Sequence, residues 1–199
     1  MTATRRDQIL TIARDLILEQ GLSGLSMRRV AARAGISATA IYRHYRDKGA
    51  LLLAVVEEGH QVFASYLFRA LEGKTPRERL RLSGQNYIRF AMEQPQYYQL
   101  IFMSWTDEKS AAEIAAKHKG KPQQPPTYQF LLDRVGECIS EGLFRKGTDP
   151  TNAALGLWSQ VHGLATLYLT GGARYQFSAA QYLERCSAVV EQMMHGLLA

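Results

Sequence analysis

Residues 26–45 of this 199-residue chain read SMRRVAARAGISATAIYRHY, and this stretch decides the predicted fold. A serine stands before each of two short helical stretches, Met27–Ala34 and Ala38–Tyr45, where its side chain can cap the first turn. Gly35 lies in the tight turn between them. The apolar residues that recur at helical spacing, and that we expect to face inward, are Met27, Val30, Ala31, Ile41 and Tyr45. Two short helices joined in this way predict a helix-turn-helix.

The second helix of a helix-turn-helix enters the major groove of DNA, and the residues at its start suit that position. Ser37, Ala38 and Thr39 are small or can form hydrogen bonds. Arg43 projects outward, and the sequence leaves open whether it contacts a guanine edge or a phosphate. Lys48 begins the following helix, where the helix dipole disfavours a cation unless an anion such as a phosphate lies nearby.

The positive charge of the chain is concentrated in its first quarter. The formal net charge is +6, of which residues 1–50 carry +5 and residues 51–199 carry +1. A local basic surface suits a polyanion, because neutralised phosphates release condensed counterions. It also suits an anionic membrane, so the charge alone does not distinguish the two.

The chain from Arg5 to Tyr45, with Asp47 and Lys48, resembles the DNA-binding domain of TetR-family regulators. The matching segments are Ile9-Leu10-x-x-Ala13, Gly21-Leu22, Ser26-Met27-Arg28-Arg29-Val30-Ala31, Ala34-Gly35-Ile36-Ser37, Ile41-Tyr42-Arg43-His44-Tyr45 and Lys48. One departure is Gly49, where the family usually has glutamate. The resemblance covers about a quarter of the chain and predicts binding to double-stranded DNA.

The same resemblance implies roles for nine residues at a DNA operator. Those that would hold backbone phosphates are Ser26 and Arg28. Those that would lie at base edges are Ser37, Ala38, Thr39 and Arg43. Those that would grip the flanking phosphates are Tyr42, His44 and Lys48.

Outside this segment, glycines, prolines and capping residues divide the chain into further helices, and no segment alternates like a strand. The expected helices run from near Thr4 to Gly21, from Lys48, from Thr75-Pro76, and over about 127–144, 150–170 and 178–197. The predicted fold class is therefore all-α. We expect a helix-turn-helix DNA-binding domain over residues 1–46 and a helical-bundle domain for ligand binding and dimerisation over residues 47–199.

The segment Leu157–Leu169 contains Trp158-x-x-x-His162-Gly163, which resembles the Trp-His-Gly class of C-terminal domains within the same family. That resemblance implies a homodimer in which the last two helices of each chain form a four-helix interface. The last helix has more apolar residues than its own core needs, namely Tyr182, Leu183, Cys186, Val189, Val190, Met193, Met194 and Leu197. The alternative is a helix wrapped by its own domain.

Aromatic residues crowd the middle of the chain. An apolar pocket with a few polar groups binds small ligands, so these residues predict a small apolar or amphipathic effector. The same side chains could instead fill a dry core. The candidate ligand-binding residues are Phe63, Tyr66, Tyr87, Phe90, Tyr98, Phe102, Trp105, Trp158 and His162.

Several other classes of protein are disfavoured. No apolar run is long enough to span a bilayer and the N-terminus lacks the apolar stretch of a signal peptide, so we expect a cytoplasmic protein without a membrane partner. Cys138 and Cys186 lie outside any CxxC motif and the histidines lack metal-ligand spacing, so we expect no metal and no cofactor. Without a Ser/His/Asp set, paired carboxylates or a glycine-rich phosphate loop, we expect no enzyme activity.

The function expected from the sequence is a transcriptional repressor. A homodimer would bind a palindromic operator, and a small-molecule effector would release it by preferring a conformation that cannot span both half-sites. The alternative is a DNA-binding regulator or activator that needs no effector, and a filled core in the second domain would favour it.

Overall fold

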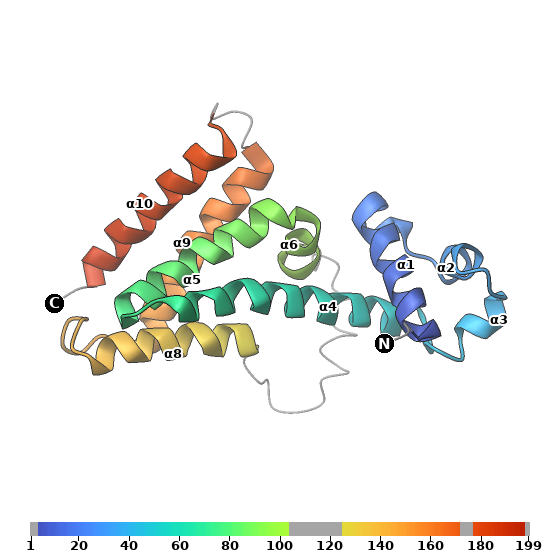
Figure 1. Cartoon of the computed structure of the whole chain (residues 1–199), viewed down its shortest axis with the longest axis horizontal. Helices are drawn as coiled ribbons and strands as arrows, with labels where there is room; N and C mark the ends of the chain where they lie inside the picture. Colours follow the sequence, from blue (N-terminus) through green and yellow to red (C-terminus); the bar gives the residue numbers. More distant parts are fainter. Residues whose placement is uncertain (1–3, 104–124, 172–176, 198–199) are drawn as a thin grey trace. The chain divides into compact units, whose positions relative to one another are not determined.

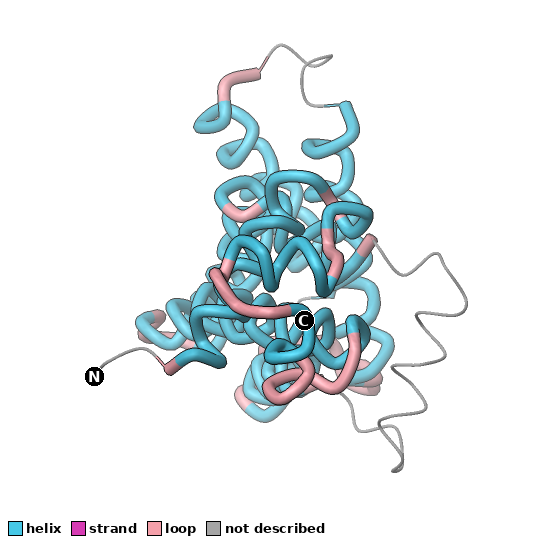
Figure 2. The backbone as a smooth tube through the Cα atoms, turned by 90° about the vertical axis from the view of Figure 1, so that its right-hand side faces the viewer, coloured by secondary structure: helices cyan, strands magenta, loops and turns pink. Residues whose placement is uncertain are grey.

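The structure is a computed structural model that describes residues 4–103, 125–171 and 177–197. All regular elements in these ranges are helices, as Figures 1 and 2 show, so the predicted all-α class is confirmed. The α-helices are α1 (Arg5–Gln20), α2 (Met27–Arg33), α3 (Ala38–Ile41), α4 (Lys48–Phe68), α5 (Pro76–Glu93), α6 (Pro95–Phe102), α8 (Pro126–Ser140), α9 (Pro150–Gly171) and α10 (Ala179–Leu197). Two 3-10 helices, η1 (Leu22–Gly24) and η2 (Arg69–Glu72), complete the list.

The chain forms two compact units, and the boundary between them falls inside α4. The described residues of the first unit are 4–61 and 96–103, and those of the second are 62–95, 125–171 and 177–197. The first unit therefore contains α6 as well as the predicted helix-turn-helix. The predicted domain boundary after residue 46 stays a prediction.

In the first unit, α1 packs against η1 and α2, and α2 packs against α3. Its fully buried side chains include Ile9, Ala13, Val30, Ile41, Leu51 and Val55. Arg14 on α1 forms an ion pair with Glu58 on α4 at 3.0 Å. Gly59 on α4 allows α6 to approach closely, because a Cβ atom there would lie 2.9 Å from the Cδ1 atom of Tyr97.

In the second unit, α5 is the central helix. It packs against η2, α8, α9 and α10, and α9 also packs against α8 and α10. Figure 1 shows α9 and α10 side by side and running in opposite directions. The buried face of α10 is a stripe at four-residue spacing, made of Tyr182, Cys186, Val190 and Met194. This stripe faces its own unit and leaves other apolar residues of α10 partly exposed.

α2 ends one residue before its predicted end at Ala34, and two helices end several residues earlier than the sequence predicts. α3 ends at Ile41, four residues before the predicted end at Tyr45, and the chain continues in turns that keep a helix-like path. The backbone N–H of His44 donates to the carbonyl of Ile41 at 3.0 Å, as does that of Tyr45 at 3.1 Å. α8 ends at Ser140, where the N–H of Leu143 bonds back to the carbonyl of Cys138 at 3.0 Å and closes the helix.

Three further findings concern the described residues. Both cysteines are buried and neither forms a disulfide. No group of three or more His, Cys, Asp or Glu side chains within these residues could hold a metal ion. None of the helices described above is both long and apolar enough to cross a membrane.

Candidate nucleic-acid interface and aromatic cluster

Local hydrogen bonds position the helix-turn-helix. The Ser26 hydroxyl accepts from the N–H of Arg29 at 3.2 Å, and the Ser37 hydroxyl accepts from the N–H of Ala40 at 3.1 Å, so each serine caps its helix as predicted. Gly35 lies in the turn with a φ of 64°, a conformation that favours glycine. Because each serine accepts through its oxygen, its hydroxyl hydrogen can still be donated to a phosphate or a base.

The nine predicted DNA-binding residues all lie in the first unit, and none of them is buried. Ser26 and His44 are half-buried. The exposed ones are Arg28, Ser37, Ala38, Thr39, Tyr42, Arg43 and Lys48. The Tyr42 side chain is unusual among them, because 53% of a large aromatic residue is exposed to solvent.

The cations of the first unit fall into two groups, and the first is engaged inside the protein. Arg14 pairs with Asp15 at 2.9 Å as well as with Glu58. Arg33 pairs with Glu19 through two hydrogen bonds, at 3.0 and 3.1 Å. Arg46 pairs with Asp47 at 2.9 Å, and Arg29 donates to the carbonyl of Gly24 at 3.1 Å and to the side chain of Gln20. The guanidinium groups of these four arginines therefore already form ion pairs or hydrogen bonds within the protein.

The second group has no ion pair within the described residues, and it includes Arg28, Arg43 and Lys48. All three are exposed and were predicted from the sequence to contact DNA. Lys48 is also the first residue of α4, where the helix dipole disfavours a positive charge. The helix-turn-helix and the start of α4 therefore carry exposed cations that form no ion pair with a described residue.

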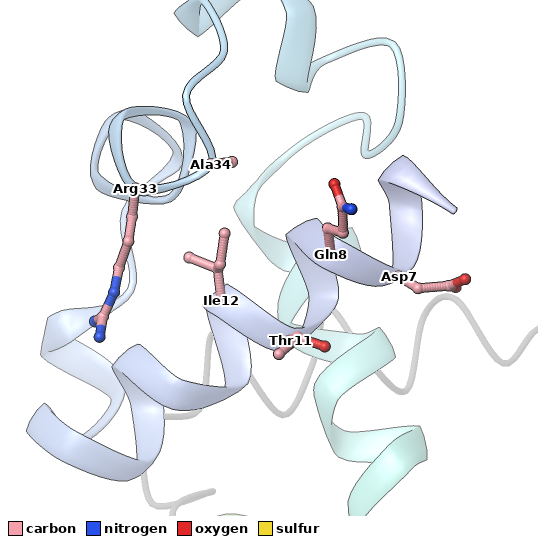
Figure 3. A pocket seen from close by; sticks show the side chains of 6 residues that line it. All are labelled: Asp7, Gln8, Thr11, Ile12, Arg33 and Ala34. Atoms are coloured by element: carbon pink, nitrogen blue, oxygen red, sulfur yellow. The ribbon is translucent and has the colours of Figure 1, made fainter. Parts of the chain in front are cut away.

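A hollow of about 440 Å³ lies elsewhere on the first unit, between α1 and the end of α2 (Figure 3). Its lining residues are Asp7, Gln8, Thr11, Ile12, Arg33 and Ala34. None of them belongs to the predicted DNA-binding or ligand-binding sets. Asp7 is engaged in the α1 capping box with Thr4, and Arg33 is paired with Glu19, so the two charged groups of the hollow are already neutralised or bonded.

Six of the nine predicted ligand-binding residues form one cluster in the second unit. Phe63 on α4 contacts Tyr87 and Phe90 on α5, with ring centroids 5.3 and 5.0 Å apart. Tyr66 also contacts Phe90, at 5.5 Å. Trp158 and His162 on α9 complete the cluster, with centroids 6.0 Å apart.

Three of the predicted ligand-binding residues are not among the six that form this cluster. Tyr98 and Phe102 contact one another in the first unit, with ring centroids 5.0 Å apart. Trp105 lies outside the described residues. The role of all three in ligand binding stays a prediction.

A chain of hydrogen bonds runs through the aromatic cluster. The indole N–H of Trp158 donates to the Tyr87 hydroxyl oxygen at 3.3 Å, and this hydroxyl lies 2.9 Å from Nδ1 of His162. Burial lowers the pKa of His162, which favours the neutral ring. In a neutral His162 that accepts the Tyr87 proton at Nδ1, the ring proton is on Nε2.

The sequence prediction missed other members of this region. Tyr128 on α8 contacts Trp158, with ring centroids 6.0 Å apart. Ser83 and Asn86 are buried polar residues of α5, each only 4% exposed. Ser83 and Asn86 are three residues apart, and each precedes an aromatic residue of the cluster, Tyr87 or Phe90, by four residues. This spacing places them on one side of the helix and could have identified them.

Two family models match the chain. The model described as "Bacterial regulatory proteins, tetR family" matches residues 9–55. The model described as "Tetracyclin repressor-like, C-terminal domain" matches residues 80–190, more than half of the chain. Both are models of regulatory proteins and not of enzymes, in agreement with the prediction. The narrower assignment to the Trp-His-Gly class stays a prediction.

Individual relatives agree with these models. The HTH-type transcriptional activator FasR of Mycolicibacterium smegmatis is 32% identical over 116 residues, which are 58% of this chain and 52% of FasR. The class A tetracycline repressor protein from transposon 1721 of Escherichia coli is 40% identical over 57 residues, 29% of this chain and 26% of that repressor. The matches thus span about half and about a quarter of these two relatives.

The likeness extends to a solved structure of a protein with unknown function from Rhodococcus sp. RHA1. That structure is 25% identical, with a TM-score of 0.78, and the match covers 100% of this chain and 97% of the other. The family model that matches residues 80–190 and this agreement in fold support the same family assignment. The chain belongs to the tetR family of bacterial regulatory proteins.

Proposed function

We propose that the protein is a homodimeric, DNA-binding regulator of transcription that recognises a palindromic operator. The observation that carries the proposal is the separation of the cations in the first unit. Internal partners engage Arg14, Arg29 and Arg33, whereas Arg28 and Lys48 are exposed and have no ion pair within the described residues. Unneutralised cations on a helix-turn-helix suit phosphate binding, because their pairing with phosphates releases counterions.

The proposed contacts divide into phosphate and base contacts. Ser26 and Arg28, at the start of α2, would hold the backbone on one side of the groove. Tyr42, His44 and Lys48 would hold the flanking phosphates. These contacts would fix the register of α3 without reading the sequence.

The base contacts would come from the first turn of α3 and the turn that follows it. Ser37 and Thr39 offer hydroxyl groups, and Ala38 offers a methyl group suited to the thymine methyl. Arg43 would read a guanine edge. We expect these residues to set the operator sequence.

The dimer would form through α9 and α10. Leu155 and Leu167 on α9 are 49% and 47% exposed, which is high for large apolar residues. On α10, Leu183, Val189, Met193 and Leu197 are only half-buried, beside the buried stripe of that helix. A partner chain that covers these residues would form a four-helix interface.

The dimer has a direct test in the oligomeric state. Leu155→Glu with Leu167→Glu should convert the protein to a monomer in sedimentation equilibrium, because two charges would be buried in the interface. Leu71→Glu is the matched control, since Leu71 is 53% exposed on η2 of the same unit. A dimer that persists in the double variant would contradict the proposed interface.

We further propose repression that a small apolar or amphipathic effector relieves by binding at the aromatic cluster. Phe63, Tyr87 and Trp158 would supply apolar surface, and the Tyr87 hydroxyl with His162 would supply polar groups. The second candidate is a regulator or activator without an effector. Ring contacts at 5.0 to 5.5 Å among Phe63, Tyr66, Tyr87 and Phe90 favour it, because they fill much of that interior. One named relative is an activator and the other a repressor.

The experiment that tests DNA binding is selection of duplexes from a random pool, with the solution mass measured in parallel. We expect an enriched inverted repeat bound by a dimer. Lys48→Ala should weaken binding to every duplex and reduce the salt dependence, whereas Lys146→Ala, an exposed lysine of the second unit, should not. Folded protein that enriches no sequence at low salt would contradict the proposal.

The selected duplex then allows the direction of regulation to be measured. In transcription in vitro from a promoter that carries this operator, a repressor should lower the transcript level. Straight-chain fatty acids and alcohols of increasing length serve as amphipathic probes of release. Increased transcription by the protein alone would favour the activator instead.

A further inference from the structure

The first two residues of α1 are both cations, Arg5 and Arg6. Positive charge at the start of a helix is opposed by the helix dipole, as at Lys48. Asp7 is the acidic residue of this first turn, but its carboxylate accepts hydrogen bonds from the N–H and hydroxyl of Thr4, at 2.9 and 2.8 Å. Neither arginine forms an ion pair with a described residue. The start of α1 therefore carries two guanidinium groups that form no described ion pair. The pKa of Asp7 is lowered mainly by its hydrogen bonds with Thr4 and to a smaller extent by the charge of Arg6.

The two arginines differ in where their guanidinium groups lie. Arg5 donates from Nη1 to the side-chain oxygen of Gln8 at 3.0 Å, along its own helix. The guanidinium carbon of Arg6 lies over the ring of Tyr45, 5.1 Å from the ring centroid. Tyr45 is only 3% exposed, so its ring is a fixed surface. Arg6 is thereby held beside the end of the segment that contains Tyr42.

The contact with the Tyr45 ring leaves the Arg6 guanidinium able to bind an anion. A cation–π contact occupies no hydrogen-bond acceptor, so the five N–H donors of the guanidinium keep their capacity to form hydrogen bonds. This contact also restricts the rotamers of Arg6 before any ligand binds, which lowers the entropy that binding would cost. A planar set of donors held in this way matches the oxygens of a phosphate.

We propose that Arg6 is a further phosphate-contacting residue of the DNA surface, and that the Tyr45 ring positions it. This inference rests on the proposed DNA binding. It extends the contacts of Tyr42, His44 and Lys48 on the flanking backbone by one cation that comes from α1. Arg6 contributes to affinity for all duplexes and not to sequence preference, because phosphates are the same at every base pair.

The test is the salt dependence of binding to the duplex selected by the intact protein, measured by fluorescence anisotropy. Each phosphate contact contributes about 0.9 to the slope of log K against log salt, so Arg6→Gln should reduce the slope of a dimer by about 1.8. Over a fourfold rise in salt, the variant should lose about 12-fold less affinity than the intact protein. Arg33→Gln is the matched control, because it removes the same charge from the same unit where Glu19 already neutralises it.

Two further measurements separate this role from a structural one. Arg6→Lys should restore most of the slope, since it retains the charge without the planar guanidinium. The melting temperature of Arg6→Gln should stay close to that of the intact protein. An unchanged slope in Arg6→Gln, or an equal reduction in Arg33→Gln, would overturn the inference while DNA binding stands. Failure of the intact protein to bind any duplex would instead overturn the proposed function on which the inference rests.

Discussion

The hydrogen-bond chain through Trp158, Tyr87 and His162 leads to a quantitative prediction for Tyr87→Phe. The substitution keeps the ring, and so preserves the contact with Phe63 at 5.3 Å, but it removes the hydroxyl that both partners use. The indole N–H of Trp158 and a ring nitrogen of His162, both on half-buried side chains, then lose a partner. An unsatisfied buried polar group costs about 1 to 3 kcal/mol.

The two hydrogen bonds should not contribute equally. The contact with His162 is 2.9 Å long and of normal length, whereas the contact from Trp158 is 3.3 Å and weaker. We therefore expect Tyr87→Phe to lower the free energy of unfolding by about 2 kcal/mol. For a chain of this size the melting temperature should fall by about 4 to 8 °C.

The assay is thermal unfolding followed by circular dichroism, at one protein concentration for all variants because association stabilises a dimer. Tyr66→Phe is the matched control. It also removes a hydroxyl from a buried ring, but its partner Glu93, 2.8 Å away, has a half-exposed side chain that water can solvate. We expect the control to lose well under half as much stability. Equal losses, or a more stable Tyr87→Phe, would refute the reasoning.

Four other predictions concern stability. Burial lowers the pKa values of His60 and His162 below 6.5, so the unfolded chain binds more protons than the folded chain near that pH. The free energy of unfolding, measured by denaturant titration, should therefore fall as the pH drops from about 7.5 to 5.5. Ser37→Ala should cost about 1 kcal/mol in the same titration, because it removes the α3 cap. Gly35→Ala, at a φ of 64°, should destabilise by about 1 to 2 kcal/mol. Gly136→Ala in α8, where space is also open, should stabilise by about 0.5 to 1 kcal/mol in thermal unfolding.

Each of these stability predictions has a result that would contradict it. A free energy of unfolding that is constant over this pH range would exclude both histidines as the source of a pH dependence. A pH dependence that is unchanged by His162→Gln would exclude His162. An unaffected Ser37→Ala would mean that the α3 cap contributes little. The same sign of change in both glycine variants would contradict the conformational explanation.

The periodicity of the sequence was sufficient to predict which side chains are buried, even where it predicted the wrong length of helix. Ile41 and Tyr45 are 0% and 3% exposed, as their spacing indicates, although α3 ends at Ile41. The turns after Ile41 keep Tyr45 on the same side because its N–H still bonds to the carbonyl of Ile41. Burial thus depended on local spacing, whereas helix length depended on the competition between hydrogen-bond patterns.

The pairing of the charges could not be predicted in the same way. The sequence shows an excess of five positive charges in residues 1–50, but not which of them are neutralised. Glu58 is 44 residues from Arg14, and Glu19 is 14 residues from Arg33, so both ion pairs depend on how the helices pack. The cation–π contact of Arg6 with Tyr45 likewise joins residues far apart in sequence.

The association of α6 with the first unit was also beyond the reach of sequence patterns. It depends on Gly59, whose missing side chain leaves room for Tyr97 and Ile101. A lone glycine inside a helical pattern predicts only a lower helix propensity. The packing partner that makes it necessary lies almost 40 residues further along the chain.

The course of α4 through both compact units has a consequence for engineering. A chimaera joined after residue 46 would transplant α1 to α3 but leave behind Leu51 and Val55, which are fully buried and belong to the same unit. It would also leave behind Tyr97, which returns to that unit from a distant part of the chain. The portion to be exchanged is therefore discontinuous. If DNA preference is to be reprogrammed, replacing the outward-facing side chains of α2 and α3 preserves the buried interior of the first unit. Grafting α1 to α3 as a whole divides that interior.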